Sequence, residues 1–272
     1  MTLLHATILG LVEGLTEFIP VSSSAHLILV RSIFNIHSGN DLAFDAVLQM
    51  ATILAVLVYF FPDLWQLYKS FVRLCLRQIV SDEDKRMIWA IILGTIPAVI
   101  IGLLLEHYME TVFRNTHLLV WTLILGSALM FWAERKGKQD KTITAKKGLI
   151  LGFFQSLALV PGISRSGATI SGGLLNGLTR SDATRFCFLL SFPIIFGSGL
   201  KEFVGVFKSG AFDLSLGGGF DTLGFPLGIG FVVAFIVGLL SIHFLITYLK
   251  NHKLTLFIWY RVVLAVAILA FL

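Results

Sequence analysis

The sequence has few charged residues and only two cysteines. Charged side chains make up 14% of the 272 residues, whereas hydrophobic ones make up 56%. A water-soluble domain needs a more polar composition, so this balance excludes an ordinary soluble protein. Cys75 and Cys187 are too few and too far apart in the sequence to indicate a zinc site or a disulfide framework, and we expect both to be packing residues.

The chain also lacks any polar stretch long enough to form a separate soluble domain. Apolar segments of about 20 residues, the length that a transmembrane helix needs, recur instead along almost the whole sequence. The clearest of them cover 43–61, 88–106, 118–133, 186–206, 226–249 and 255–272. We therefore predict an all-α polytopic membrane protein in which residues 1–272 form a single integral membrane domain.

Basic residues are confined to short loops between the apolar segments. The loops 62–87, 134–147, 179–185 and 250–254 are rich in Lys and Arg, which places them on the cytoplasmic side of a membrane. They share one side only if the polar segment 148–178 dips into the membrane without crossing it, and both termini then lie outside. The net charge of +5 forms no continuous basic stripe, so we do not expect nucleic acid as a partner.

The two halves of the sequence resemble each other. The matching pairs are LGLVEGL at 9–15 with LGFFQSL at 151–157, SSSA at 22–25 with SRSG at 164–167, and, more weakly, GLLLEHYM at 102–109 with GLLSIHFL at 238–245. We predict repeats at about 1–134 and 148–272, each with one re-entrant helical hairpin followed by three transmembrane helices. Because three is odd, the repeats would be inverted, and the hairpin tips would meet near the midplane of the membrane.

The first predicted hairpin contains the motif EGLTEFIPVSSSAH, which begins at Glu13. Helical spacing places Glu13 and Glu17 one turn apart on the same face. Pro20 would interrupt a continuous helix but suits the first turn of a new one, so we expect two half-helices at 2–18 and 21–33. Each is too short to span a bilayer.

Ser22, Ser23 and His26 share the start of the second half-helix. Polar and ionisable side chains at membrane depth are costly unless they line a cavity or find partners, so this cluster indicates a functional site. The alternative for Glu13 and Glu17 is an interfacial helix whose carboxylates contact water. For His26 taken alone, a packing role is the better interpretation.

The second predicted hairpin contains PGISRSGAT at 161–169. Its glycines permit tight turns, and hydroxyl and guanidinium donors come from Ser164, Arg165, Ser166 and Thr169. A guanidinium binds phosphate oxygens in a bidentate manner, and backbone N–H groups at a helix start complement an anion. The pattern therefore favours a phosphate site, although Ser and Gly are also common where helices pack closely in lipid.

Together, the two motifs resemble the signature motifs of the undecaprenyl-diphosphate phosphatase family, also called the bacitracin-resistance family. The resemblance covers the full chain and includes Gln49, the segment starting at Thr95, Tyr260 and Arg261, whereas Ala25 replaces a glycine found in many members. It implies hydrolysis of undecaprenyl diphosphate to undecaprenyl phosphate, which recycles the lipid carrier of peptidoglycan synthesis. It further implies a bacterial cytoplasmic (inner) membrane enzyme with a divalent cation, a site open to the outer face, and a homodimer.

On this resemblance, roles can be given to the candidate residues. Arg165 would hold the diphosphate and neutralise charge during phosphoryl transfer. Glu13 and Glu17 would hold Mg²⁺ or Ca²⁺, or Glu17 would orient a neighbouring catalytic group. Further substrate contacts are expected from Ser22, Ser164, Ser166, Thr169 and Arg261.

Three routes remain open for attack on phosphorus: Ser23 assisted by His26, His26 itself, or a water activated by His26. The shared helical face of Ser23 and His26 favours the first. The competing function is a transporter or flippase of polyprenyl phosphate, because inverted repeats with broken helices are a transporter design. A Glu, Ser and His set opposite an Arg exceeds what binding alone requires, which favours the phosphatase.

Overall fold

The structure, a computed structural model, describes residues 1–36, 41–111, 116–137, 142–208 and 224–271. These ranges are helical and contain no strand. The elements are α1 Leu3–Thr16, α2 Ser23–Ile33, α3 Asp41–Tyr59, α4 Phe61–Cys75, α5 Asp82–Thr111, α6 Thr116–Lys136, α7 Ala145–Ser156, the short 3₁₀ helix η1 Leu157–Leu159, α8 Arg165–Leu175, α9 Arg180–Lys208, α10 Gly224–Asn251 and α11 Thr255–Phe271. The predicted all-α fold is confirmed.

Over its described residues each predicted span coincides with a helix, although 43–61 extends past the bend between α3 and α4. Within the described ranges, α5, α6, α9 and α10 are each long and apolar enough to cross a membrane. Helix α3 joins α4 through a bend of 78°, and the pair together would count as a fifth span. Helix α11 is apolar but has 17 residues, which corresponds to about 26 Å of helix. The chain is therefore built as an integral membrane protein.

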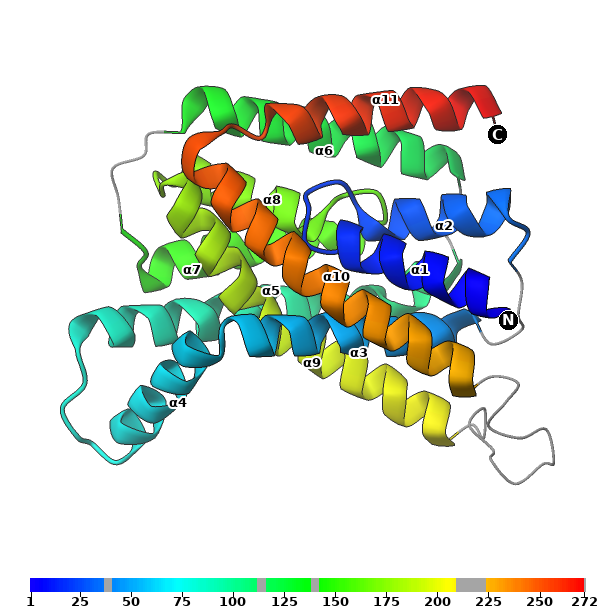
Figure 1. Cartoon of the computed structure of the whole chain (residues 1–272). Coiled ribbons are helices and arrows are strands. Elements are labelled where there is room, and N and C mark those ends of the chain that lie inside the picture. The colour runs from blue at the N-terminus through cyan, green and yellow to red at the C-terminus, as the bar shows by residue number, and fades with distance from the viewer. Residues whose placement is uncertain (37–40, 112–115, 138–141, 209–223, 272) are drawn as a thin grey trace.

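Two short helical hairpins occupy the centre of the bundle. Helices α1 and α2 correspond to the predicted half-helices, and α7, η1 and α8 form the second hairpin. Figure 1 shows the α1–α2 loop and the α7–α8 loop side by side in the middle of the molecule, with the two hairpins entering from opposite ends. The N- and C-terminal ends lie together at one end of the bundle. Inversion relative to a membrane stays a prediction.

The first helix of each hairpin packs closely on a long helix of the other half. In α1, a Cβ at Gly10 would collide with the backbone of Gly230 in α10, and in α7 a Cβ at Gly152 would collide with the backbone of Gly94 in α5. The predicted repeat relates these two contacts to each other, because Gly10 in the first half corresponds to Gly152 in the second, and Gly94 corresponds to Gly230. Small residues at such contacts let helix backbones approach. This reciprocal packing holds both hairpins inside the bundle.

The basic connections gather at the other end of the bundle from the termini (Figure 1). Arg180, the first residue of α9, pairs with Glu134 at the end of α6 at 2.5 Å. The same carboxylate accepts the backbone N–H of Leu254, before α11, at 2.9 Å. Arg185 of α9 pairs with Asp63 of α4. These contacts agree with the prediction that the basic loops share one side. Segment 62–87 is more than a loop, however, because it contains most of α4.

Gly152→Ala should lower the stability of the protein, because the added Cβ meets the backbone of Gly94, which cannot move aside as a side chain can. Overpacking of this kind typically costs about 1–3 kcal/mol. Thermal unfolding in detergent, followed by tryptophan fluorescence, would measure it. Gly228→Ala is the matched control, since nothing lies within 4 Å of a Cβ there. Equal melting of the two variants would contradict close packing of α7 on α5.

Candidate functional site

The start of α2 is shaped by an unusual backbone conformation at Ser22. Its φ of 77° lies in the left-handed region, which a residue other than glycine adopts at a cost of about 1–3 kcal/mol. Pro20, upstream, cannot donate a backbone hydrogen bond and so separates α2 from α1. Ser22 makes no side-chain cap, which leaves the first N–H groups of α2 without an intrahelical partner.

The start of α8 is built by a similar turn in the second hairpin. Gly162 has a φ of 93°, and a side chain there would collide with the hydroxyl of Thr122 in α6. Ser164 caps α8 by accepting the N–H of Gly167 at 3.2 Å, and its hydroxyl lies 3.0 Å from that of Ser166. Arg165 is the first residue of α8, so its guanidinium leaves the chain at the hairpin tip.

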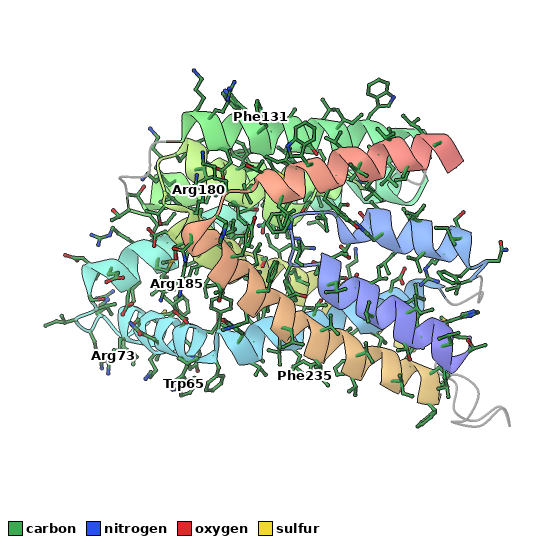
Figure 2. All side chains as sticks on the ribbon, turned by 45° about the horizontal axis from the view of Figure 1, so that its top comes forward. Trp65, Arg73, Phe131, Arg180, Arg185 and Phe235 are labelled. Atoms are coloured by element: carbon green, nitrogen blue, oxygen red, sulfur yellow. The ribbon has the colours of Figure 1, made fainter. Side chains whose placement is uncertain are left out.

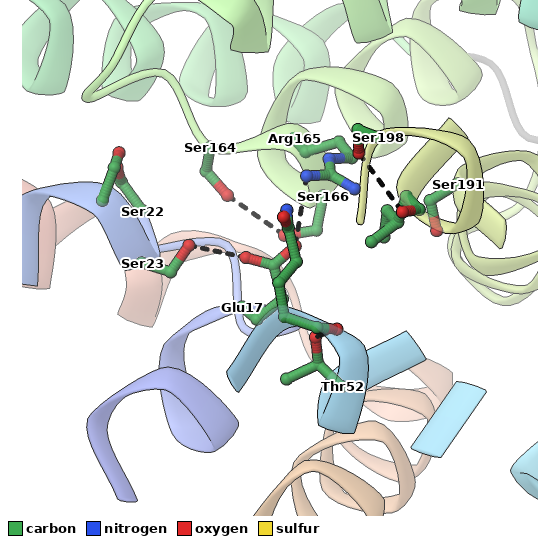
Figure 3. A network of polar contacts seen from close by, with 12 residues as sticks. Glu17, Ser22, Ser23, Thr52, Ser164, Arg165, Ser166, Ser191 and Ser198 are labelled. Carbon is green, nitrogen blue, oxygen red and sulfur yellow. Dashed lines mark hydrogen bonds and ion pairs between the residues drawn. The ribbon is translucent and has the colours of Figure 1, made fainter. Parts of the chain in front are cut away.

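The two tips meet through an ion pair and hydrogen bonds. Glu17, just after α1, accepts the Ser23 hydroxyl on Oε2 at 2.6 Å and contacts Arg165 Nη2 through Oε1 at 3.3 Å. The backbone N–H of Gly162 points to the hydroxyl of Ser24 at 3.5 Å. Figure 3 shows Ser23, Glu17 and Arg165 pointing toward one another. The predicted convergence of acid and hydroxyl with a cation from the other hairpin is present.

The site combines several features that suit an anion. The N-terminal ends of α2 and α8 both lie at this centre, and helix N-termini carry partial positive charge. Arg165 Nη1 is buried and has no hydrogen-bond partner in the described part of the chain. A small cavity adjoins the pair, lined by Glu17, Phe18, Arg165, Ser166, Cys187, Phe188, Ser191 and Ile195. A phosphate group placed here would meet donors from two helices.

His26 is held by partners other than Ser23. Its Nδ1 lies 2.7 Å from the carbonyl oxygen of Ser22, which can only accept, so Nδ1 donates. Its Nε2 lies 2.7 Å from the hydroxyl of Tyr260 in α11, and the two rings are stacked. The structure thus gives Ser23 a carboxylate partner, Glu17, in place of the histidine that helical spacing favoured.

Arg261 is completely buried and supports the second hairpin from α11. Its Nη2 donates to the carbonyl of Gly162 at 2.9 Å and to that of Leu123 at 3.1 Å, while Nε donates to the Ser127 hydroxyl at 3.2 Å. Its Nη1 is buried without a hydrogen-bond partner in the described part of the chain, so the contacts show a supporting role while a substrate contact stays a prediction. Backbone carbonyls inside an apolar bundle need donors, and the guanidinium supplies them to the turn before Arg165.

Of the other predicted substrate contacts, Ser22 and Thr169 do not line the small cavity. The Ser22 hydroxyl contacts that of Ser24 at 3.2 Å, and Thr169 lies one turn beyond Arg165 with no exposed surface. Ser166 lines the cavity.

Glu13 is 4% exposed, one turn before Glu17, and close enough to Glu17, Asp45 and Arg165 to interact with their charges. The structure records no hydrogen bond to its carboxylate within the described ranges. The same ranges contain no group of three His, Cys, Asp or Glu that could hold a metal ion. Two carboxylates suit a hard cation that takes its other ligands from substrate and water.

Sequence reasoning gave no role to three polar residues that complete the site. Tyr260 contacts His26, Ser127 contacts Arg261, and Thr122 donates its hydroxyl to the carbonyl of Pro161 at 2.6 Å. All three lie in otherwise apolar helices, α6 and α11. A hydroxyl group within an apolar span is a sign that a residue has a polar partner. The sequence does not show which partner each of these three hydroxyls contacts.

Comparison with known proteins finds relatives along the whole chain. The family model described as bacitracin resistance protein BacA matches residues 6–267. A protein named undecaprenyl-diphosphatase from Chloroherpeton thalassium is 40% identical over 283 aligned residues, covering 100% of this chain and 97% of that protein. Proteins of the same name from Micrococcus luteus and an Arthrobacter species are 39% and 38% identical, covering 100% and 97% of this chain and 98% and 92% of theirs. The similarity thus includes both hairpins.

Arg261→Met should destabilise the protein, because the buried Gly162 carbonyl loses its donor and the Leu123 carbonyl, which also accepts the Ser127 hydroxyl, loses a charged one. Hydrogen bonds to a charged group typically contribute about 1.5–3 kcal/mol each, so we expect a large fall in the melting temperature in detergent. Lys253→Met removes an exposed cation just before α11 and should leave melting unchanged. If Arg261→Met also melted normally, the proposed support of the second hairpin would be wrong.

Proposed function

The chain belongs to the bacitracin resistance protein BacA family, and on this membership we propose that it is a membrane undecaprenyl-diphosphatase. It would hydrolyse undecaprenyl diphosphate to undecaprenyl phosphate and inorganic phosphate, recycling the lipid carrier for peptidoglycan synthesis. The observation that supports the reaction is the meeting of Ser23, Glu17 and Arg165 at the ends of two hairpins. This set supplies a nucleophile, a proton acceptor and a cation, which phosphoryl transfer requires.

Binding of the diphosphate would use the donors that the structure leaves available. Arg165 already faces a carboxylate through Nη2 and has Nη1 without a partner in the described ranges, so it could contact Glu17 and a phosphate oxygen together. The uncapped N–H groups at the start of α2 and the first turn of α8 would contact further oxygens. Charge that develops in the transition state would lie against these fixed donors.

For the chemical step we propose Ser23 as nucleophile and Glu17 as its base. The Ser23 oxygen would attack the terminal phosphorus, and its proton would pass to Glu17 over the existing 2.6 Å contact. The bond from that phosphorus to the bridging oxygen breaks, and undecaprenyl phosphate leaves. Water then attacks phosphoserine, releases inorganic phosphate and restores Ser23. His26, engaged at both nitrogens, would hold the Ser22 carbonyl and so the start of α2.

A divalent cation is proposed as cofactor, with Glu13 and Glu17 as its protein ligands. When bound, such an ion neutralises phosphate oxygens and withdraws charge from phosphorus. Glu13 suits this role because it is buried among charged groups and no hydrogen bond to its carboxylate is recorded within the described ranges. Mg²⁺ and Ca²⁺ both prefer oxygen ligands of this kind.

We place the protein in the bacterial cytoplasmic membrane, with the basic end of the bundle inside and both termini and the opening of the site outside. The positive-inside rule supports this orientation. A homodimer is an expectation from the family resemblance. The alternative, a flippase of polyprenyl phosphate, is less well supported, because the relatives are named for cleavage of a diphosphate.

The first test is phosphate release from undecaprenyl diphosphate by purified protein. Ser23→Ala should lower the rate by at least about a thousandfold, and Glu17→Gln by about a hundred- to ten-thousandfold. Ser32→Ala, an exposed serine on the same helix, should have no effect.

Acid quenching during turnover distinguishes the routes of attack. Phosphoserine survives acid, whereas phosphohistidine does not. Labelled phosphate from the substrate that stays on Ser23 after the quench would therefore support Ser23 as the nucleophile. A Ser23→Ala variant that folds and keeps its rate would rule out Ser23 as the nucleophile. Absence of phosphate release by the native protein would refute the proposed phosphatase activity.

Removal of divalent cations with EDTA should abolish turnover, and added Mg²⁺ or Ca²⁺ should restore it. Glu13→Gln should raise the cation concentration needed for half-maximal activity by about tenfold or more, since one of two protein ligands is weakened. Equilibrium dialysis with labelled Ca²⁺ gives a readout apart from activity. Full activity in EDTA would remove the role assigned to Glu13.

A further inference from the structure

Helix α4 is turned away from the spans that precede and follow it. The 19 residues of α3 correspond to about 28 Å, close to the thickness of the hydrocarbon core, so α3 can cross the membrane without α4. The 78° bend after Tyr59 then turns α4 away from the direction of α3, and Pro62 occupies its first turn. A helix at a large angle to a spanning one lies near the plane of the membrane surface.

The side chains of α4 divide into two faces. One face packs on the protein: Asp63 pairs with Arg185, and Ser70 donates to Asp84 at 2.8 Å. The other face is exposed and apolar, and it carries four aromatic residues at spacings of three and four residues, the first three of which stack on one another. These are Phe61, Trp65, Tyr68 and Phe71, each between 44% and 57% exposed.

A basic edge runs beside the aromatic face. Lys69 and Arg73 are one turn apart, are exposed, and form no ion pair within the described ranges. The Lys69 ammonium lies 5.9 Å from the centre of the Trp65 ring, so cation and aromatic face adjoin. Figure 2 shows Trp65 and Arg73 at the outer edge of the molecule. Of the acids nearby, Asp63 pairs with Arg185, Asp84 accepts the Ser70 hydroxyl and Asp82 lies 3.8 Å from Lys85. None of these described acids, nor Glu83, forms an ion pair with Lys69 or Arg73.

We propose that α4 is an interfacial helix that binds anionic phospholipid headgroups. Its aromatic face would lie among the acyl chains, and Lys69 and Arg73 would extend from the same helix to headgroup phosphates. Amphipathic helices with aromatic residues on one face and Lys or Arg beside them occupy this depth in a bilayer. The partner follows from charge: two exposed cations without an ion-pair partner in the described ranges attract anionic lipids more strongly than zwitterionic ones. This inference is independent of the proposed catalytic activity.

Cys75, at the end of α4, allows a direct test. It is exposed, whereas Cys187, the other cysteine, is buried, so a fluorescent label can be attached at one position. Labelled protein would be reconstituted in mixed vesicles in which either phosphatidylglycerol or phosphatidylcholine is brominated, at equal mole fraction. The ratio of the two quenching efficiencies measures the preference for the anionic headgroup next to α4.

We expect phosphatidylglycerol to be preferred, by about fivefold for each cation at low ionic strength, and the preference to fall as salt is added. Lys69→Gln/Arg73→Gln should bring the ratio close to one while both lipids still quench. Lys85→Gln/Arg86→Gln, which removes two cations from the neighbouring start of α5, should keep the native ratio.

Three results would overturn the proposal. Absence of quenching by either lipid would show that α4 does not enter the bilayer, and a native ratio of one would show that it does not select anionic headgroups. Melting in detergent checks that each variant is folded. An equal loss of preference in both double variants would assign the effect to overall charge and not to α4.

Discussion

The ion pair between Glu17 and Arg165 is the interaction on which the rest of the structure depends. Each residue lies at the tip of a hairpin too short to span a bilayer, and a single charge at that depth is costly. Their 3.3 Å contact gives each a counter-charge, and Glu17 gains a second partner in the Ser23 hydroxyl. Neither hairpin could hold its charge inside the membrane alone, so the two must fold against each other. The site is assembled by the same contact that permits the hairpins to be there.

Helix α11 fixes how the hairpins face each other. Its adjacent residues Tyr260 and Arg261 point in directions about 100° apart, as successive residues of a helix do. Tyr260 contacts His26 beside the start of α2, and Arg261 donates to the Gly162 carbonyl just before α8. A rotation or shift of α11 would therefore move both tips at once. This makes α11 a structural support for the ion pair, although it contributes neither Glu17 nor Arg165.

Much of this architecture could be predicted from the sequence because lipid imposes simple requirements. Segment length identified the spans, and Pro20 separated the half-helices that became α1 and α2. Helix α4 was not predicted, since its basic residues suggested a loop, yet apolar residues recur at positions 61, 65, 68 and 72 with helical spacing. The partner of Ser23 could not be predicted either. Ser23 follows Ser22, whose left-handed conformation a serine does not predict, so the direction in which the Ser23 hydroxyl points could not be read from the sequence.

The scarcity of charge in the sequence and the charge of the proposed substrate can be reconciled at the hairpin tips. A diphosphate needs several positive partners, but each Lys or Arg brought into the bilayer must itself be stabilised. Backbone N–H groups at the starts of α2 and α8 provide partial positive charge without adding an ionised side chain. Arg165 then has to supply only one full charge, and Glu17 balances it before substrate arrives. Breaking two helices at the centre of the bundle is thus a way to bind an anion in lipid with one arginine.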